Sequence, residues 1–419
     1  MMNSRGQFCG RSVVGMVLVI GILVAIVAVP VFSDVVSFPD PGLEAAIRQA
    51  IGKPTGDIYD TDLAGLEDLD ASSRSIVNLE GIQHCASLTS LNLESDWGAG
   101  PPNKIIDISP LEGLTNLAIL NLEANRIIDI SPLEDLTNLT ELDLSWNHVV
   151  DISPLSSLTN LTELSLIRND IVDISPLEGL TKLTELSLIS NEIVDISPLK
   201  GFTNLTELDL SFNEIVDISP LEDLTKLTEL YLDGNQIVDI SPLSSLTNLT
   251  ELDLSFNEIV DISPLEGLTN LTELDLSWNH VVDISPLSSL TKLTILNLEG
   301  NQIVDISPLE GLTNFTILNL GANNIVDISP LEGLTNLTEL SLTSNEIVDI
   351  SPLKGFTNLT ELSLSFNEIV DISPLEGLTN LMEIYLKDNE LDLTSGSPDM
   401  MDIQALQERG VIVRYRLDD

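Results

Sequence analysis

Carboxylates are the side chains whose number and spacing in this sequence could do chemistry. Acidic residues outnumber basic residues 66 to 17, which gives a formal net charge of −49. Many of the acids recur at one position of a repeated motif, directly before a Leu-x-Leu triplet. These glutamates are Glu141, Glu163, Glu185, Glu207, Glu229, Glu251 and Glu273, and Glu339, Glu361 and Glu383 resume the series. A regular row of carboxylates attracts basic segments or loosely held cations, whereas two carboxylates with separated pKa values can act as general acid and base.

Catalysis is not the interpretation that the sequence favours. An exposed row of identical acids lacks the burial that would separate the pKa of an acid from that of a base. The sequence contains no HExxH, P-loop, GxSxG or strand-to-helix GxGxxG motif. Two cysteines and three scattered histidines are too few for a Cys- or His-based metal centre. We therefore predict that the protein is not an enzyme and needs no cofactor, with weak association of Ca²⁺ left open.

The charge balance also excludes a class of partner. Binding to nucleic acid needs clustered lysines and arginines that contact phosphates, and this chain has few basic residues. We predict no nucleic-acid partner. The acidic rows point instead to a protein partner with a basic surface.

A 22-residue repeat must position these acids. In the copy LTELDLSFNEIVDISPLEDLT the reference residue is Asn213, and the same asparagine recurs every 22 residues from Asn103 to Asn389, fourteen times. The alternation Leu208-Asp209-Leu210 predicts a short strand whose leucines are buried. Stacked copies would form a parallel ladder in which each asparagine amide donates to and accepts from turn backbone groups. The predicted fold class is therefore an α/β solenoid with a parallel sheet on one side.

The motif Asp-Ile-Ser-Pro-Leu predicts the other side of each coil. Ser before Pro is a helix-start signal, and the remaining length holds only a single 3₁₀ turn. We expect the aspartate of this motif, from Asp107 to Asp371, to accept backbone N–H groups of the turn. The Asn-Leu-Thr triplets, such as 138–140, match N-glycosylation acceptors but arise from the repeat itself.

Both ends of the stack have predicted caps, because an uncovered terminal coil would expose its apolar face to solvent. Residues 34–65 form a predicted helical N-terminal cap, with a helix that begins at Asp40-Pro41. Residues 66–390 hold about 14–15 repeats. Residues 391–419 are predicted to form a C-terminal helix and strand, with Ser397-Pro398 at the start of the helix.

The segment before these domains predicts export. Arg5 and Arg11 precede an uncharged run of twenty residues, 13–32. Such a run is typical of an export signal and also long enough to cross a membrane as a helix. We predict that residues 1–33 are a signal peptide or an N-terminal membrane anchor that contacts the membrane. The positive-inside rule then places the rest of the chain outside the cell, either secreted or held at the cell surface.

The pattern LxxLxLxxNxIxDISPLxxL resembles the 22-residue class of leucine-rich repeats, and most closely the internalin-like repeats of prokaryotic surface proteins. The lead-in FPDPGLEAAI is similar to the N-terminal cap of that family. The resemblance implies a right-handed β-α superhelix, or horseshoe, with the sheet on its concave face and 3₁₀ turns on its convex face. It also implies binding of other macromolecules, usually on the concave sheet. The regulatory subunit of protein phosphatase 1 shares the repeat class, so an intracellular protein of that kind is a third alternative.

Three features of the expected concave side could contact a partner. The first is the glutamate row, for which simple copying of a solvated acid is the alternative explanation. The second is a set of aromatic residues directly before the ladder asparagine, which could instead be half-buried against the next turn. The third is an uncharged window where isoleucines interrupt the glutamates. The predicted partner-binding face comprises Glu141, Trp146, Glu163, Glu185, Glu207, Phe212, Glu229, Tyr231, Glu251, Phe256, Glu273, Trp278, Ile295, Asn297, Ile317, Asn319 and Phe366.

These observations predict an exported, monomeric repeat protein that mediates protein–protein interaction or adhesion at the cell surface. The alternative is a structural cell-surface protein whose acidic repeat array associates with cations.

Overall fold

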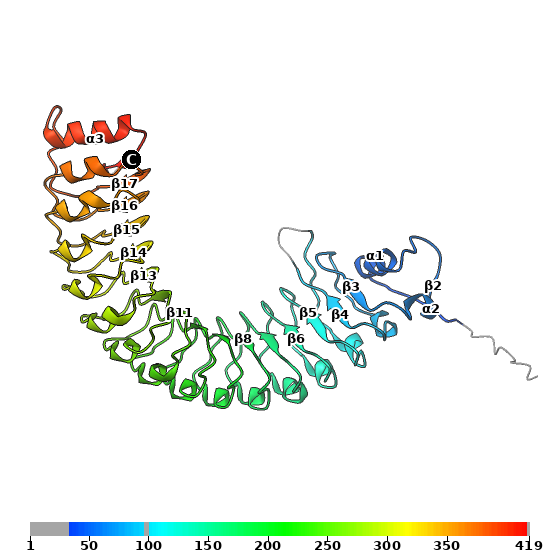
Figure 1. The fold of residues 1–419 in the computed structure, drawn as a ribbon. Coiled ribbons are helices and arrows are strands. Elements are labelled where there is room, and N and C mark those ends of the chain that lie inside the picture. The colour runs from blue at the N-terminus through cyan, green and yellow to red at the C-terminus, as the bar shows by residue number, and fades with distance from the viewer. Residues whose placement is uncertain (1–32, 96–99, 417–419) are drawn as a thin grey trace, which may run out of the picture.

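The computed structural model describes residues 33–95 and 100–416, which form an open arc of stacked coils (Figure 1). The predicted signal or anchor segment, residues 1–32, lies outside the described residues. Within the described ranges no helix has both the length and the apolar character needed to span a membrane.

Each coil adds one short strand to a parallel sheet. The sheet has sixteen strands in the described part of the chain, ordered β3 to β18 without crossovers. Leu230 lies beside Leu208 on one neighbouring strand and Leu252 on the other, so equivalent residues of successive repeats are in register. The strands are β3 (Asp68–Asp70), β4 (Ser90–Asn92), β5 (Ile119–Asn121), β6 (Glu141–Asp143), β7 (Glu163–Ser165), β8 (Glu185–Ser187), β9 (Glu207–Asp209), β10 (Glu229–Tyr231), β11 (Glu251–Asp253), β12 (Glu273–Asp275), β13 (Ile295–Asn297), β14 (Ile317–Asn319), β15 (Glu339–Ser341), β16 (Glu361–Ser363), β17 (Glu383–Tyr385) and β18 (Ile412–Arg414). The predicted parallel ladder is confirmed.

Short 3₁₀ helices lie on the outer side of the arc (Figure 1). Nearly all begin at the serine of a Ser-Pro-Leu triplet, because proline has the fixed φ of a first helical turn and no N–H to leave unpaired. They span Ile82–His84, Ser109–Leu111, Ser131–Leu133, Ser153–Ser157, Ser175–Leu177, Ser197–Leu199, Ser219–Leu221, Ser241–Ser245, Ser263–Leu265, Ser285–Ser289, Ser307–Leu309, Ser329–Leu331, Ser351–Gly355 and Ser373–Gly377. A parallel sheet on the inside and wider 3₁₀ turns on the outside curve the stack, as predicted.

The ladder asparagine joins neighbouring coils. Asn213 Nδ2 donates to the carbonyls of Leu188 (3.0 Å), Leu210 (3.0 Å) and Ser211 (3.2 Å). Its Oδ1 accepts the Ile193 backbone N–H at 3.1 Å. Because these groups are buried, leaving any of them unpaired would cost about 1–3 kcal/mol. A side chain that both donates and accepts is therefore needed at this position, as the sequence predicted.

A second asparagine series links the coils along the exposed surface. Asn138 Nδ2 donates to the Thr115 carbonyl at 2.7 Å, and Asn248 Nδ2 donates to the Thr225 carbonyl at 2.8 Å. These asparagines belong to the Asn-Leu-Thr triplets. Their amides have a structural role between coils, which explains why the triplet recurs.

The N-terminal cap is fastened by one buried carboxylate. Helix α1 (Pro41–Ala50) covers the β3 end of the sheet, with Leu43 and Ile47 buried. Asp40 Oδ1 accepts the Gly42 N–H at 2.8 Å, and Asp40 Oδ2 accepts the Val77 N–H at 2.9 Å. Asp40 therefore caps the helix and ties it to the first coil. The same region holds the antiparallel pair β1 (Val35–Val36) and β2 (Ile58–Tyr59) and the short helix α2 (Asp60–Leu63).

The C-terminal cap, a helix followed by a strand, lies in the segment that the sequence indicates. Helix α3 (Pro398–Glu408) has Ser397 as its N-cap and packs against β18 at the other end of the sheet (Figure 1). Arg409 donates to the Glu376 carbonyl at 3.1 Å. Strand β18 pairs with β17, and Arg414 Nε donates to Glu383 Oε1 at 2.7 Å. The helix and the final strand are confirmed.

Candidate functional site

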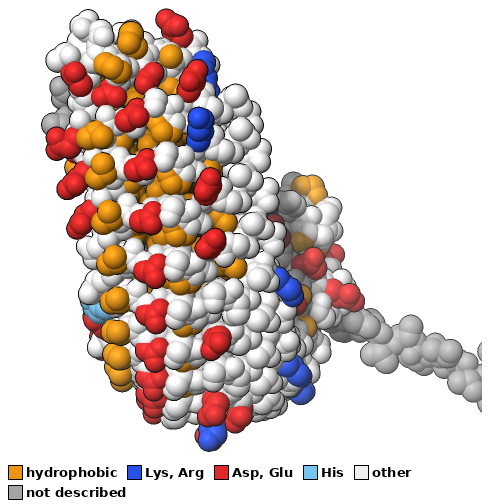
Figure 2. Space-filling model, turned by 60° about the vertical axis from the view of Figure 1, so that its left-hand side comes forward, with side chains coloured by type: hydrophobic (Ala, Val, Ile, Leu, Met, Phe, Trp, Pro, Cys, Tyr) orange, Lys and Arg blue, Asp and Glu red, His pale blue; other side chains and the backbone are white. Residues whose placement is uncertain are grey.

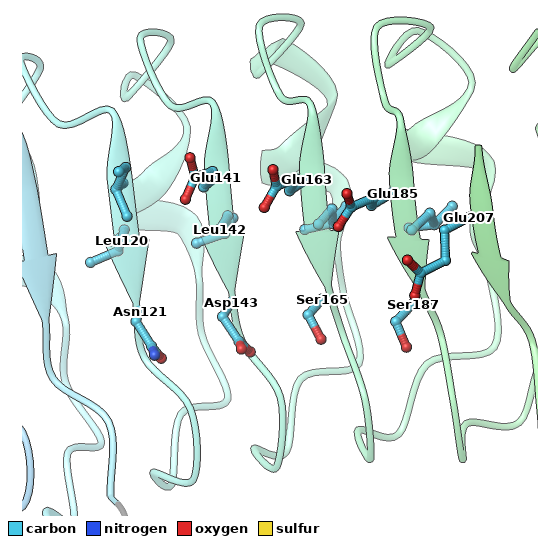
Figure 3. A pocket seen from close by; sticks show the side chains of 13 residues that line it. Leu120, Asn121, Glu141, Leu142, Asp143, Glu163, Ser165, Glu185, Ser187 and Glu207 are labelled. Atoms are coloured by element: carbon cyan, nitrogen blue, oxygen red, sulfur yellow. The ribbon is translucent and has the colours of Figure 1, made fainter. Parts of the chain in front are cut away.

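The structure gathers the predicted glutamates into one row on the inner face of the sheet. Glu229 is the direct neighbour of Glu207 and Glu251, and the same register holds from β6 to β12. Figure 3 shows Glu141, Glu163, Glu185 and Glu207 on successive strands, beside a parallel row that contains Asp143, Ser165 and Ser187. The buried leucines between the two rows point the opposite way, because side chains alternate along a strand.

A shallow hollow of about 320 Å³ lies over this part of the row (Figure 3). Glu141, Glu163, Glu185 and Glu207 line it with their side chains. The strand leucines Leu120, Leu142, Leu164 and Leu186 also line it, but they are only 1–3% exposed because their side chains point into the core. None of the residues that line it is basic. The hollow can therefore accept a cationic side chain, whose charge the surrounding carboxylates would neutralise.

Several carboxylates of the inner face have raised pKa values. Burial, together with repulsion from Glu229 and Glu185, raises the pKa of Glu207. Burial, with repulsion from Glu251, raises the pKa of Glu273. Burial raises the pKa of Asp253 to about 6, and Asp275 adds repulsion. A positive group from a partner would relieve this repulsion.

Tyr231 takes the place of an aspartate in the second row. Its hydroxyl donates to Glu229 Oε2 at 3.3 Å. Burial, followed by the contact with Glu251, raises the pKa of Tyr231. The phenol therefore stays protonated and presents a hydrogen-bond donor between two glutamates.

The side chains of the uncharged window are less available to a partner than the sequence suggested, because neighbouring coils contact them. Ile295 and Ile317 are direct neighbours on β13 and β14, and each is only partly exposed. Asn297 Nδ2 donates to Asp275 Oδ2 at 2.8 Å, and Asn319 Nδ2 donates to Glu299 Oε2 at 2.9 Å. Both amides are thus committed to carboxylates of the preceding coil.

An equivalent window near the N-terminal end was missed. Ile119 and Asn121 occupy the same two positions on β5, and Ile119 is 39% exposed. Asn121 Nδ2 donates to Glu94 Oε2 at 2.7 Å. The signal was the Ile-Leu-Asn triplet shared by 119–121, 295–297 and 317–319. Ile119 also lines the hollow beside Glu141, so an apolar contact there adjoins the acidic row.

The aromatic residues occupy a constrained turn after each strand. Trp146, Phe212, Phe256, Trp278 and Phe366 have left-handed φ values between +52° and +59° and remain 45–56% exposed. A β-carbon on Gly234 would meet the Phe212 ring at 2.7 Å, which shows that this ring covers the next coil. Phe256 and Trp278 stack at 5.9 Å, and Arg168 lies 4.0 Å from the Trp146 ring centre. The rings are thus half-buried against their neighbours, and their outer faces stay open.

The aspartates of the Asp-Ile-Ser motif are turn residues, as predicted. Asp129 Oδ1 accepts the Ser131 N–H at 2.9 Å, and Asp239 Oδ1 accepts the Ser241 N–H at 2.8 Å. These backbone N–H bonds lower the pKa of Asp129 and of Asp239. Their carboxylates stay charged on the outer face at neutral pH.

A row of exposed valines beside these aspartates was missed. The residue before each aspartate is Val or Ile from Ile106 to Val370, and these side chains are 42–59% exposed. Figure 2 shows a row of apolar side chains beside a row of acidic ones on the outer face. The available signal was the triplet Ile215-Val216-Asp217, in which the alternation that buries the isoleucine must expose the valine.

Cysteine and histidine side chains are sparse in the described residues. No group of three or more His, Cys, Asp or Glu residues suited to a metal ion occurs in residues 33–95 and 100–416. Burial raises the pKa of the Cys85 thiol to about 12, so this thiol stays protonated and unreactive. His280 Nε2 lies 2.8 Å from Glu258 Oε2 in an exposed pair between two coils.

The family model for "Leucine Rich repeats (2 copies)" matches residues 137–179, 159–201, 203–245, 247–289, 269–311, 291–332, 313–355 and 357–396. No curated protein is similar enough in sequence to count as a match.

Solved structures give the same result. The internalin inlF from Listeria monocytogenes is 38% identical, with 83% of this chain and 95% of that chain covered at a TM-score of 0.71. A leucine-rich-repeat protein of Leptospira interrogans has the same fold at 24% identity, with 85% and 97% covered and a TM-score of 0.74. The plant peptide hormone receptor RGFR1, solved in complex with RGF2, shares the fold at 20% identity, with 80% and 69% covered and a TM-score of 0.59. Repeat model, identity and coverage agree, and the chain belongs to the leucine-rich repeat proteins of the internalin-like class.

Proposed function

We propose that this protein is exported and binds a protein partner with a basic surface through the concave face of its solenoid. The observation that carries the proposal is the row of glutamates in register from β6 to β12, together with a hollow over β5 to β9 that has no basic lining residue. Neighbouring carboxylates about 5 Å apart repel by roughly 1 kcal/mol even at the dielectric of water. A partner that supplies lysines or arginines removes this repulsion when it binds.

The fold supports a protein or peptide as the ligand. Leucine-rich-repeat solenoids are interaction scaffolds with an extended curved surface rather than a closed catalytic pocket. RGFR1 was solved in complex with RGF2, and it shares this fold. We infer a binding protein rather than an enzyme, and a monomer in solution because a net charge of −49 opposes self-association.

The test compares two variants that remove the same charge from different places. Glu163, Glu185 and Glu207 are changed together to Gln on the inner face. The matched control changes Asp57→Asn, Glu67→Gln and Glu408→Gln, which are exposed acids outside both rows. Binding of a labelled oligolysine peptide to the full chain is followed by fluorescence anisotropy.

The inner-face variant should bind about tenfold more weakly, since three charge pairs of about 0.5 kcal/mol each are lost. The control should change affinity by less than about twofold, because its charges lie elsewhere. Equal weakening by both variants would show that only the overall charge attracts the peptide and would remove the concave face from the proposal.

Export is proposed from the basic and apolar character of residues 1–33. The measurement is the mass of the protein recovered from cells and from their medium. A chain shortened by about thirty residues in the medium indicates a cleaved signal peptide, and a full-length chain in the membrane fraction indicates an anchor. A full-length chain in the cytosol would contradict export.

A further inference from the structure

The exposed valine row is not explained by the core. In the coil around Val216, Ile215 and Ile218 are buried while Val216 and Asp217 face solvent. Thr has the same shape and the same branching at Cβ, and its hydroxyl would suit a solvent-exposed position. Even so, an apolar residue occupies this position thirteen times between Ile106 and Val370. Contiguous apolar surface of this kind is uncommon on a monomer unless something covers it.

The row is accompanied by repeated grooves between coils. One groove of about 380 Å³ is lined by Val216, Asp217 and Ser219 from one coil and by Val238, Asp239 and Pro242 from the next. Equivalent grooves occur between other coils, including those that contain Val172 and Val194. The outer face therefore offers similar notches between several pairs of coils, in which valines or isoleucines lie beside aspartates and serines.

Charge identifies what fits these notches. Asp217 and Asp239 border the row on one side, and Ser219 and Ser241 N–H groups hold these carboxylates in place at 2.8 Å. On the other side of the row the residue before each buried Ile or Val varies. It is Glu192 and Glu214 in two adjacent coils, but Gln236 and His280 in other coils and a basic residue near the N-terminal end. An apolar stripe beside one continuous acidic row complements a ligand with an apolar stripe beside basic residues. It disfavours a second copy of this chain and an anionic membrane, since both would bring negative charge against negative charge.

The spacing suits a helix. An α-helix has a pitch of about 5.4 Å. Stacked strands lie about 4.8 Å apart, and coils on the outer side of an arc are farther apart than at the sheet. A helix laid along the row therefore places about one apolar residue over each coil. Its flanking lysines or arginines then reach the aspartates along one side and, at the coils of Val194 and Val216, Glu192 and Glu214 on the other side.

We propose that the convex valine row is a second docking face, which binds a basic amphipathic helix of a partner protein. The site is separate from the concave glutamate row, so the two proposals stand or fall independently. Apolar contact supplies the affinity, and the row of aspartates selects for positive charge beside the apolar stripe.

The experiment uses the full chain and a synthetic helical peptide of about eighteen residues, about 27 Å long. The peptide has leucines at every third and fourth position and lysines on both sides of that stripe. Its control is a scrambled peptide of identical composition, which has the same charge but no stripe. The protein variant changes Val194, Val216, Val238 and Val260 to Thr, which keeps their shape and removes their apolar surface.

The striped peptide should bind the parent protein at least about tenfold more tightly than the scrambled peptide. The Val→Thr variant should lose this difference and still unfold at the parent temperature. A second variant, Glu192→Gln with Glu214→Gln, should weaken binding of the striped peptide without any change to the valines. The concave variant E163Q/E185Q/E207Q should keep the tenfold difference, which separates this proposal from the concave one.

Equal binding of the two peptides, or a tenfold difference that survives in the Val→Thr variant, would overturn the proposal. The proposal would also be overturned if either of two other occupants bound the valine row. Sedimentation that shows self-association lost on Val→Thr substitution would identify a second copy. Flotation with phosphatidylcholine vesicles that is lost in the same variant would identify a lipid surface.

Discussion

The concave and convex faces carry aspartates with the same local hydrogen bond and opposite pKa shifts. On the concave face, Asp253 Oδ1 accepts the Ser255 N–H at 2.8 Å. On the convex face, Asp129 Oδ1 accepts the Ser131 N–H at 2.9 Å. Yet the pKa of Asp253 is raised to about 6, whereas the pKa of Asp129 is lowered.

Burial explains the difference. Asp253 is partly buried in the row between Tyr231 and Asp275, and the loss of water outweighs its bond to the backbone. Asp129 is exposed, so water solvates its charge and the backbone bond dominates. Asp129 thus stabilises the fold at neutral pH, and Asp253 weakens it. Acids that weaken a fold need another reason to be present, and a basic partner is such a reason.

Replacing the inner aspartate should give the largest effect on stability. Asp253→Asn is a conservative change, because Asn297 holds the equivalent position and its Oδ1 accepts the Glu299 N–H at 3.1 Å. The rise of the Asp253 pKa from its ordinary value to about 6 corresponds to about 3 kcal/mol of free energy by which folding disfavours the charged form. Solvent screening of this partly exposed carboxylate reduces the expected gain at pH 7 to about 1–2 kcal/mol.

The pH dependence gives the sign of this effect. In the folded parent Asp253 binds its proton more tightly than in the unfolded chain. Its stabilising contribution is therefore complete below about pH 4 and is lost as the pH rises through about 6. Urea unfolding at pH 4 and pH 7 should show D253N more stable than the parent at pH 7 only. An equal difference at both pH values would mean that the charge of Asp253 is not the cause.

Replacing an outer aspartate should give a smaller effect of opposite sign. Asp129→Ala removes the acceptor for the Ser131 N–H and should cost about 0.5–1 kcal/mol at pH 7. Because the pKa of Asp129 is lowered in the fold, its charged form stabilises above the ordinary pKa and the benefit disappears as the pH falls through the lowered value. Relative to the parent, the free energy of unfolding of D129A should therefore rise to the parent's value as the pH falls. D253N, which is more stable than the parent at pH 7, should also lose its advantage as the pH falls. Destabilisation by D129A that persists at low pH would assign the cost to packing instead.

Local signals in the sequence were sufficient to predict the strands, turns and caps of the solenoid. Three signals each favour a single local structure: the strand alternation around Leu208, the amide of Asn213 and the proline of each Ser-Pro-Leu triplet. The repeat presents the same signals fourteen times. The caps were visible because Asp40 and Ser397 are strong helix N-caps.

Contacts between coils were not predictable in the same way. The bond from Asn297 to Asp275 depends on the distance between neighbouring strands, which no single repeat contains. The left-handed backbone of Phe212 runs against the usual preference of a bulky residue. It is imposed by the Asn213 bonds to Leu210 and Ser211, which close the turn. Val216 was missed because one exposed valine beside a buried isoleucine is ordinary on a protein surface, and only the stacking of coils joins such valines into a row.

Salt should give the smallest effect, and it tests whether either acidic face holds a specific cation. Raising NaCl from about 0.05 M to about 0.5 M shortens the Debye length from about 14 Å to about 4 Å, which screens the repulsion along the glutamate row. The melting temperature should rise by about 1–2 °C, and by less in E163Q/E185Q/E207Q. Because the described residues hold no suitable cluster of three ligands, Ca²⁺ and Mg²⁺ at matched ionic strength should act alike. Extra stabilisation by Ca²⁺ alone would favour a cation-associating surface array over a protein-binding face, since it would give the acids a reason for repeating that needs no partner.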